Sequence, residues 1–185
     1  MAGLIIAIAA VLVLLTVFVI SIYNALIRLR NQVDNAWSQI DVQLKRRHDL
    51  IPNLVETAKG YMKHERGTFE AITNARSQAM GAKTVSEASK AEGALGEALS
   101  KFMLVVENYP DLKANQNFLS VQEELTGTEN RIAFARQSYN DQVLFFNNKI
   151  QMFPSNIIAG MFSFGKRDFF EIEIAAEREV PKVSF

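Results

Sequence analysis

The strongest constraint on this chain is an uncharged apolar run close to its N-terminus. Residues 3–22 read GLIIAIAAVLVLLTVFVISI, and only Thr16 and Ser21 in this run are polar. A helix of about twenty apolar residues spans the ~30 Å hydrocarbon core of a bilayer. We therefore expect residues 3–22 to form a transmembrane anchor, preceded by a short extracytoplasmic N-terminus of residues 1–2. The side chains expected to face lipid include Leu4, Ile5, Ile6, Val11, Leu12, Leu14, Leu15, Phe18, Ile20 and Ile22.

The residues that flank this run indicate an uncleaved anchor and its orientation. A cleaved signal peptide has a basic segment before a shorter apolar run and a small-residue cleavage site. Here no basic residue precedes the run, and Ile22-Tyr23-Asn24 is a poor cleavage context. The alternative is a helix buried in a protein core. Basic residues follow at Arg28, Arg30 and 45–47, so the positive-inside rule predicts a single-pass protein with its N-terminus outside and the rest in the cytoplasm.

Composition excludes some classes of function. The 20 Lys and Arg residues balance 20 Asp and Glu, whereas nucleic-acid binders usually carry a basic excess, so we expect no nucleic-acid partner. The chain has no cysteine, which excludes disulfides, thiol catalysis and thiolate metal sites. It has only two histidines, His48 and His64, which would face different ways on one helix. We expect no catalytic residue, no metal site and no cofactor.

Three helical stretches follow the anchor, which predicts an all-α fold. The first continues from the anchor to about Gly60 with heptad-like apolar spacing, and we expect Pro52 to kink it rather than end it. The second covers residues 68–109, and the third covers residues 116–153. Their similar lengths favour an antiparallel bundle over residues 23–153. We prefer three long helices, with the NYPD turn (residues 108–111) near the membrane and the C-terminus far from it; a bend at Gly81 would make four helices.

Two polar gaps interrupt the apolar stripes of the first and third stretches. Arg47 and His48 fall where the first stripe requires a core residue, and Glu129 and Asn130 form a similar gap in the third. Buried polar layers can fix helix register and oligomeric state. We therefore predict a polar layer of these four residues. A nucleic-acid patch at residues 45–48, or a metal site on His48, is the alternative.

The tail, residues 154–185, differs in composition from the bundle. We expect it to be irregular or to hold a short strand, because Phe170, Ile172 and Ile174 alternate with glutamates. The tail also carries a group of aromatic residues, which either cap the end of the bundle or form a docking surface for a neighbouring subunit or partner. These residues are Phe162, Phe164, Phe169 and Phe170.

Several separated motifs resemble one family. They are YNALIRLRNQVDNAWSQIDVQLKRRHDLIPNLVETAKGY, ENYPDLKANQNFLSVQEELTGTENRIAFARQSYNDQV, NNKIQMFPSNIIA and the closing DFFEIEIAAEREVPKVSF. In this order they resemble the LemA family over nearly the whole chain beyond the anchor. The resemblance implies a helical protein anchored in the bacterial cytoplasmic (inner) membrane, and it supplies no catalytic residues. It also implies relatives in systems that organise membranes, and others that neighbour membrane proteases or phosphatase-like proteins.

Two functions follow as expectations. The first is a non-enzymatic homo-oligomeric scaffold, in which copies anchored in the bilayer pack their long helices side by side and shape or organise the membrane. The second is an adaptor that presents the surface around Arg46 and Arg47, or the tail, to a protease, a phosphatase or a signalling partner.

Overall fold

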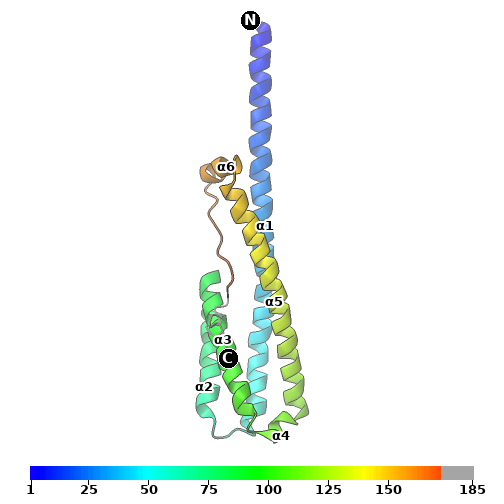
Figure 1. The fold of residues 1–185 in the computed structure, drawn as a ribbon, viewed down its shortest axis with the longest axis vertical. Coiled ribbons are helices and arrows are strands. Elements are labelled where there is room, and N and C mark those ends of the chain that lie inside the picture. Colours follow the sequence, from blue (N-terminus) through cyan, green and yellow to red (C-terminus); the bar gives the residue numbers. More distant parts are fainter. Residues whose placement is uncertain (172–185) are drawn as a thin grey trace, which may run out of the picture. The chain divides into compact units, whose positions relative to one another are not determined.

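The computed structural model describes residues 1–171, and all of the regular structure in them is helical (Figure 1). The prediction of an all-α fold is therefore confirmed for the described part of the chain. Its helices are α1 (Ala2–Lys59), α2 (Arg66–Gly81), α3 (Val85–Val106), α4 (Pro110–Lys113), α5 (Gln116–Gln151) and α6 (Ser155–Met161). Helix α1 continues through Pro52 without ending.

The chain divides into two compact units. The anchor unit comprises Met1–Gln39 and Gln137–Asp168, and the bundle unit comprises Ile40–Arg136 together with the last described residues, 169–171. Each of α1 and α5 contributes one segment to each unit.

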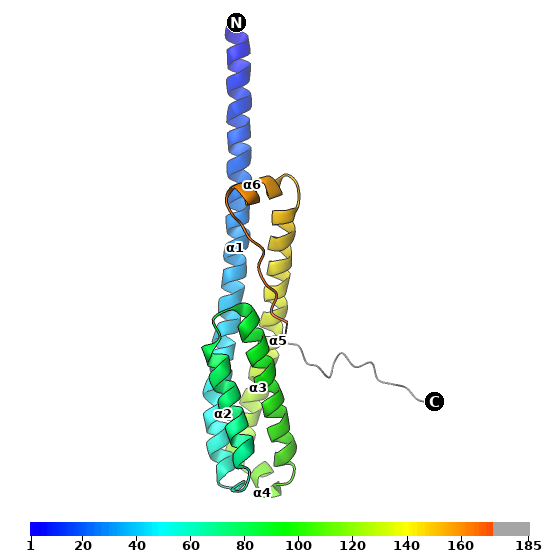
Figure 2. The ribbon, with the colours of Figure 1, turned by 90° about the vertical axis from the view of Figure 1, so that its left-hand side faces the viewer.

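The second helical stretch is a hairpin of two helices, and our preference for one long helix was wrong. Helix α2 ends at Gly81, and α3 begins at Val85 and runs beside α2 (Figures 1 and 2). Thr84 and Glu87 form a capping box, with Glu87 N donating to Thr84 Oγ1 at 3.1 Å and Thr84 N donating to Glu87 Oε2 at 3.2 Å. This cap satisfies backbone donors that a continuous helix would have bonded internally, so the sequence at residues 81–87 favours a new helix start.

The hairpin also moves the NYPD turn away from its expected position. Tyr109 Oη donates to Glu65 Oε1 at 3.0 Å, and Asn115 Nδ2 donates to Tyr61 Oη at 2.9 Å. Both partners lie in the connection that follows α1, so the turn packs at the end of α1 where α2 begins. The expected position, at the end of the bundle unit where α1 enters it, was wrong, because an additional chain reversal at residues 82–84 exchanges the two ends of the bundle.

The bundle unit encloses one apolar core lined by its four longer helical segments. Stripe residues of α1 meet aromatic and small residues of α2, α3 and α5, and Phe102 packs against both Phe69 and Phe118 at ring-centroid distances of 6.1 and 6.4 Å. The fully buried members include Leu54, Ala58, Met62, Ile72, Leu95, Phe102 and Leu112.

The anchor unit is held together by aromatic contacts and by a returning strap. The Trp37 and Tyr139 ring centroids lie 5.5 Å apart, which joins α1 to α5. After α6 the chain runs back along α5, and Asn147 accepts from and donates to the Arg167 backbone at 2.9 Å each way. Tyr139 Oη donates to the Asp168 carbonyl at 2.9 Å, and burial raises the pKa of the Tyr139 hydroxyl to about 12.

The tail aromatics have four different environments. Phe162 and Phe164 lie against Tyr23, at the end of the apolar run, and the expectation that the C-terminus lies far from the membrane falls on residues outside the described part of the chain. Phe164 also contacts Phe146, and Phe169 is partly exposed. Phe170 is fully buried, and the next residue's carbonyl, that of Glu171, accepts a hydrogen bond from Ser89 on α3. The predicted strand falls largely on residues 172–185, outside the described part of the chain.

The apolar run of α1 is uncovered. α1 contains one window long and apolar enough to cross a membrane, and none of that window is buried within the chain. Among the predicted anchor residues only Ile22 is buried, and the others are exposed.

Candidate functional site

The candidate site lies where charged residues interrupt the apolar stripe of α1. Arg47 and His48 follow Leu44 by three and four residues and precede Ile51, so helical periodicity directs them into the bundle core. Arg47 has only 2% of its surface exposed and His48 only 6%. Charged groups at this depth require partners, because desolvation without compensation costs several kcal/mol per ion.

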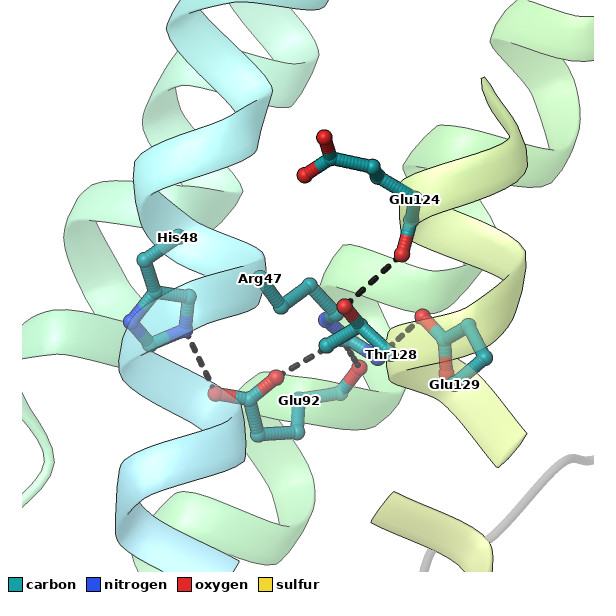
Figure 3. Close-up of polar contacts among 6 residues, drawn as sticks. All are labelled: Arg47, His48, Glu92, Glu124, Thr128 and Glu129. Atoms are coloured by element: carbon teal, nitrogen blue, oxygen red, sulfur yellow. Dashed lines mark hydrogen bonds and ion pairs between the residues drawn. The ribbon is translucent and has the colours of Figure 1, made fainter. Parts of the chain in front are cut away.

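A single glutamate on α3 is the partner of both residues. Glu92 Oε1 lies 2.7 Å from His48 Nε2, and Glu92 Oε2 lies 2.7 Å from Arg47 Nη2 (Figure 3). Arg47 Nη2 also donates to the Glu92 backbone carbonyl at 3.1 Å. An ionised carboxylate only accepts hydrogen bonds, so with Glu92 ionised the Nε2 of His48 carries the proton. Glu92 is 1% exposed, and its charge is balanced entirely by contacts from α1.

A second carboxylate reaches the same guanidinium from α5. Arg47 Nη1 donates to Glu129 Oε1 at 2.7 Å, and the Glu129 side chain is 46% exposed (Figure 3). Beside it the buried Thr128 donates its hydroxyl to the Glu124 carbonyl one turn earlier at 2.8 Å. Arg47 therefore joins one buried carboxylate on α3 to one half-exposed carboxylate on α5.

The remaining helix of the bundle contributes Arg76. Its Nε donates to the His48 carbonyl at 2.7 Å, so α1, α2, α3 and α5 all contribute to one polar cluster. We call Arg47, His48, Arg76, Glu92 and Glu129 the ion cluster. Within it Arg47 Nε has no hydrogen-bond partner, and Glu92 Oε2 meets Arg47 as an ion pair without hydrogen-bond geometry. The cluster ties four helices at one level of the bundle.

Comparison with known proteins identifies the family of this chain. The profile of the LemA family matches residues 36–185, which include every member of the ion cluster. The chain belongs to the LemA family. It is 29% identical over 162 residues to Protein LemA of Metamycoplasma hominis, a match that covers 86% of this chain and 71% of that protein. It is also 23% identical over 184 residues to Magnetosome protein MamQ 2 of Paramagnetospirillum magneticum and 22% identical to Magnetosome protein MamQ of Magnetospirillum gryphiswaldense, each covering 85% of this chain and 68% of the relative.

The cluster of this LemA-family chain contains three of the four residues in the predicted polar layer. Arg47, His48 and Glu129 come together, whereas Asn130 is exposed and lies outside the cluster. The reason is helical spacing: the stripe of α5 passes from Leu125 through Thr128 to Ile132, in steps of three and four residues. Asn130 therefore points away from the core, and Thr128 occupies the position of the stripe between Leu125 and Ile132.

Glu92 and Arg76 were missed by the sequence reasoning. Glu92 follows Ala88 by four residues and precedes Leu95 by three, so it lies on the buried face of α3. A charged residue at a buried position of a helical stripe could have indicated a buried ion pair from the sequence alone. Arg76 gave no signal, because its partner is a backbone carbonyl.

The cluster has the chemistry of a structural ion network. Among the described residues there is no group of three or more His, Cys, Asp or Glu side chains placed to hold a metal ion. The names of the family and of these relatives indicate no catalytic activity. In the cluster, Glu92 is committed to Arg47 and His48, and Glu129 is committed to Arg47.

Proposed function

We propose that this chain is a non-enzymatic protein, anchored in the bacterial cytoplasmic membrane by residues 3–22, that assembles with copies of itself into a scaffold. The observation that carries the proposal is the uncovered apolar run of α1, of which no part of the membrane-length window is buried. Burying a large aliphatic or aromatic side chain is worth about 1.5–3 kcal/mol, so leaving nine such anchor side chains in water would cost on the order of 15–25 kcal/mol. A bilayer removes this cost.

The orientation that we propose follows from the basic residues after the run. Arg28 and Arg30 favour the cytoplasmic side for the chain beyond the anchor. Because the chain contains no cysteine, a single introduced cysteine is a unique label. With a membrane-impermeant maleimide applied to intact cells, we expect Ala2→Cys to be labelled and Lys63→Cys to be labelled only after lysis. The reverse pattern would overturn the orientation.

Self-assembly is supported by apolar side chains that the bundle unit leaves in solvent. Helices α1 and α5 are antiparallel, and Arg47 on α1 pairs with Glu129 on α5. Val42 lies five residues before Arg47 and Phe134 lies five residues after Glu129, so these two side chains are at the same level of the bundle unit. Val42 is 60% exposed and Phe134 is 75% exposed. A neighbouring copy would cover both, while the ion cluster holds α1 and α5 in the register that sets these two side chains at one level.

Particle size tests the scaffold. The full-length protein in mild detergent, examined by electron microscopy with mass determination, is expected to form large repeating assemblies. Phe134→Ser should reduce their size, and Leu104→Ser, which changes an equally exposed side chain on α3, should not. Monomers or dimers in every detergent would overturn the scaffold, and the adaptor for a protease or phosphatase-like partner would then be the function to test.

A further inference from the structure

A second uncovered apolar surface lies in the anchor unit, at the end of α5 and in α6. We define it as the apolar foot. Its side chains are large and exposed, and Phe153 and Met161 are 79% and 70% exposed. The foot comprises Met152, Phe153, Ile157, Met161 and Phe162.

On α6 a polar side chain is buried while large apolar side chains are exposed, the reverse of the usual arrangement. Ser155, Ile158 and Ala159 on α6 are buried against the chain's own residues, while Ile157 and Met161, one turn apart on another face, are exposed. Exposed single apolar residues are ordinary in soluble proteins. A cluster of five within eleven consecutive residues is a patch of the kind that marks an interaction surface.

Contacts within the anchor unit fix the position of the foot along α1. The Phe162 ring centroid lies 4.7 Å from that of Tyr23, and the Phe164 centroid lies 5.8 Å from it. Tyr23 immediately follows Ile22, the last residue of the apolar run. Both views of the fold show α6 beside α1 (Figures 1 and 2). The foot is therefore level with the place where α1 leaves the hydrocarbon core, where interfacial aromatic residues normally lie.

Basic residues lie close to the foot in the sequence and just beyond the apolar run on α1. Arg28 and Arg30 are six and eight residues beyond Ile22, or roughly 9 and 12 Å along the helix axis, and the Arg30 guanidinium lies 5.6 Å from the Phe164 ring centroid. Lys149 and Lys166 flank the foot in sequence, and Asp34 is paired with Arg167 at 3.0 Å. This combination of apolar tip and basic rim complements a bilayer surface that carries anionic phospholipid.

We propose that the apolar foot inserts into the headgroup region of the bilayer that α1 spans, as a second membrane attachment of the same chain. The inference rests on the proposed anchor, because the bilayer is identified by the continuity of the foot with residues 3–22. Short amphipathic segments insert to about 5–10 Å, at the boundary of headgroups and acyl chains. The position of Tyr23 sets the foot at this depth without any further movement of the chain.

Depth-dependent fluorescence quenching tests the foot in the full-length protein. Single cysteines at Ile157 and Met161 would carry a small environment-sensitive dye in vesicles of phosphatidylethanolamine and phosphatidylglycerol that contain nitroxide-labelled lipid. We expect loss of fluorescence from both sites, stronger with the nitroxide near the headgroup than with the nitroxide deep in the acyl chain. Leu12→Cys serves as the reference inside the bilayer, with the opposite depth preference. Lys101→Cys, which is exposed in the bundle unit, serves as the unquenched reference.

The outcomes separate the foot from the anchor. Quenching at Leu12 without quenching at Ile157 and Met161 would overturn the foot and leave the anchor intact. Absence of quenching at Leu12 would overturn the anchor itself. A second copy rather than lipid would cover the foot if the unlabelled Met161→Cys variant formed disulfides between copies while the dye-labelled sample stayed unquenched. The proposal would then fail.

Discussion

The two units of this protein invert the usual distribution of side chains in opposite ways. The bundle unit buries Arg47, His48 and Glu92, whereas the anchor unit exposes the apolar run of α1 and the apolar foot. Buried charges cost free energy that partners must offset, and here the partners belong to the same chain. Exposed apolar surface also costs free energy, and its partner must come from outside the chain. The charges that the bundle unit buries therefore have their partners within the chain, while the apolar surface of the anchor unit requires a second phase.

The largest expected effect comes from removing the shared carboxylate. Glu92→Ala leaves His48 buried without its carboxylate and leaves Arg47 with only the half-exposed Glu129, and breaking a buried pair in this way costs about 3–5 kcal/mol. The free energy of unfolding, measured by urea titration of the full-length protein in mild detergent, should fall by that amount. Glu97→Ala is the matched control on the same helix, because Glu97 forms an exposed pair with Lys101 at 2.7 Å and solvent screens such pairs. Equal losses in the two variants would show that the buried charges of the bundle unit do not depend on their partners within the chain.

The next effect concerns the requirement for a second phase. Leu12→Arg places a charge near the middle of the apolar run, where insertion scales assign Arg about 3 kcal/mol against insertion. The free energy of insertion, measured from the fraction of chains inserted in a translocon assay, should become less favourable by about 3 kcal/mol, while Leu12→Ala should change it by less than half of that. An unchanged inserted fraction for Leu12→Arg would mean that something other than lipid covers this run.

Alkaline pH tests the buried hydroxyl of the anchor unit. Tyr139 in the unfolded chain loses its proton near pH 10, whereas burial holds the pKa of the folded hydroxyl at about 12. Its contribution to stability is therefore complete below about pH 10 and is lost as the pH rises from 10 toward 12. Two pKa units correspond to at most about 3 kcal/mol. In Tyr139→Phe this part of the pH dependence should disappear, and an unchanged profile would show that Tyr139 is not the titrating group.

The smallest effect separates the two carboxylates of the ion cluster. Glu129 is half-exposed, so Glu129→Ala should cost only about 1 kcal/mol, with a further change in assembly size if register depends on it. Glu124→Ala removes a similarly exposed carboxylate that lies 3.7 Å from Arg46, and we expect less than about 0.5 kcal/mol from it. A loss at Glu129 as large as that at Glu92 would show that burial does not govern the strength of these pairs.

Features governed by local spacing could be predicted from the sequence. The apolar run, the helical stripes and the inward direction of Arg47 and His48 all follow from helical periodicity within one segment. The capping box of Thr84 and Glu87 is also a local pattern, but it does not fix the direction of the helix that it starts. A helix start after Gly81 is compatible with a bend or with full reversal of the chain, and tertiary packing of α2 on α3 decides between them.

Features that join distant segments could not be predicted in the same way. Glu92 lies 45 residues from Arg47 along the chain, and its role depends on which face of α3 meets α1. The foot depends on the contact of Phe162 with Tyr23, and no local pattern in the sequence pairs two residues so far apart along the chain.

The sharing of Glu92 by two neighbours also limits how this sequence can diverge. Replacement of Glu92 removes the carboxylate that Arg47 and His48 share. Replacement of Arg47 leaves Glu92 paired with His48 alone and removes the partner of Glu129. Each single step passes through a destabilised intermediate, while joint replacement by apolar residues of similar volume can be neutral or stabilising. Across a deep alignment, positions 47, 48 and 92 should therefore change together, and the pairing of position 47 with position 129 should vary more freely.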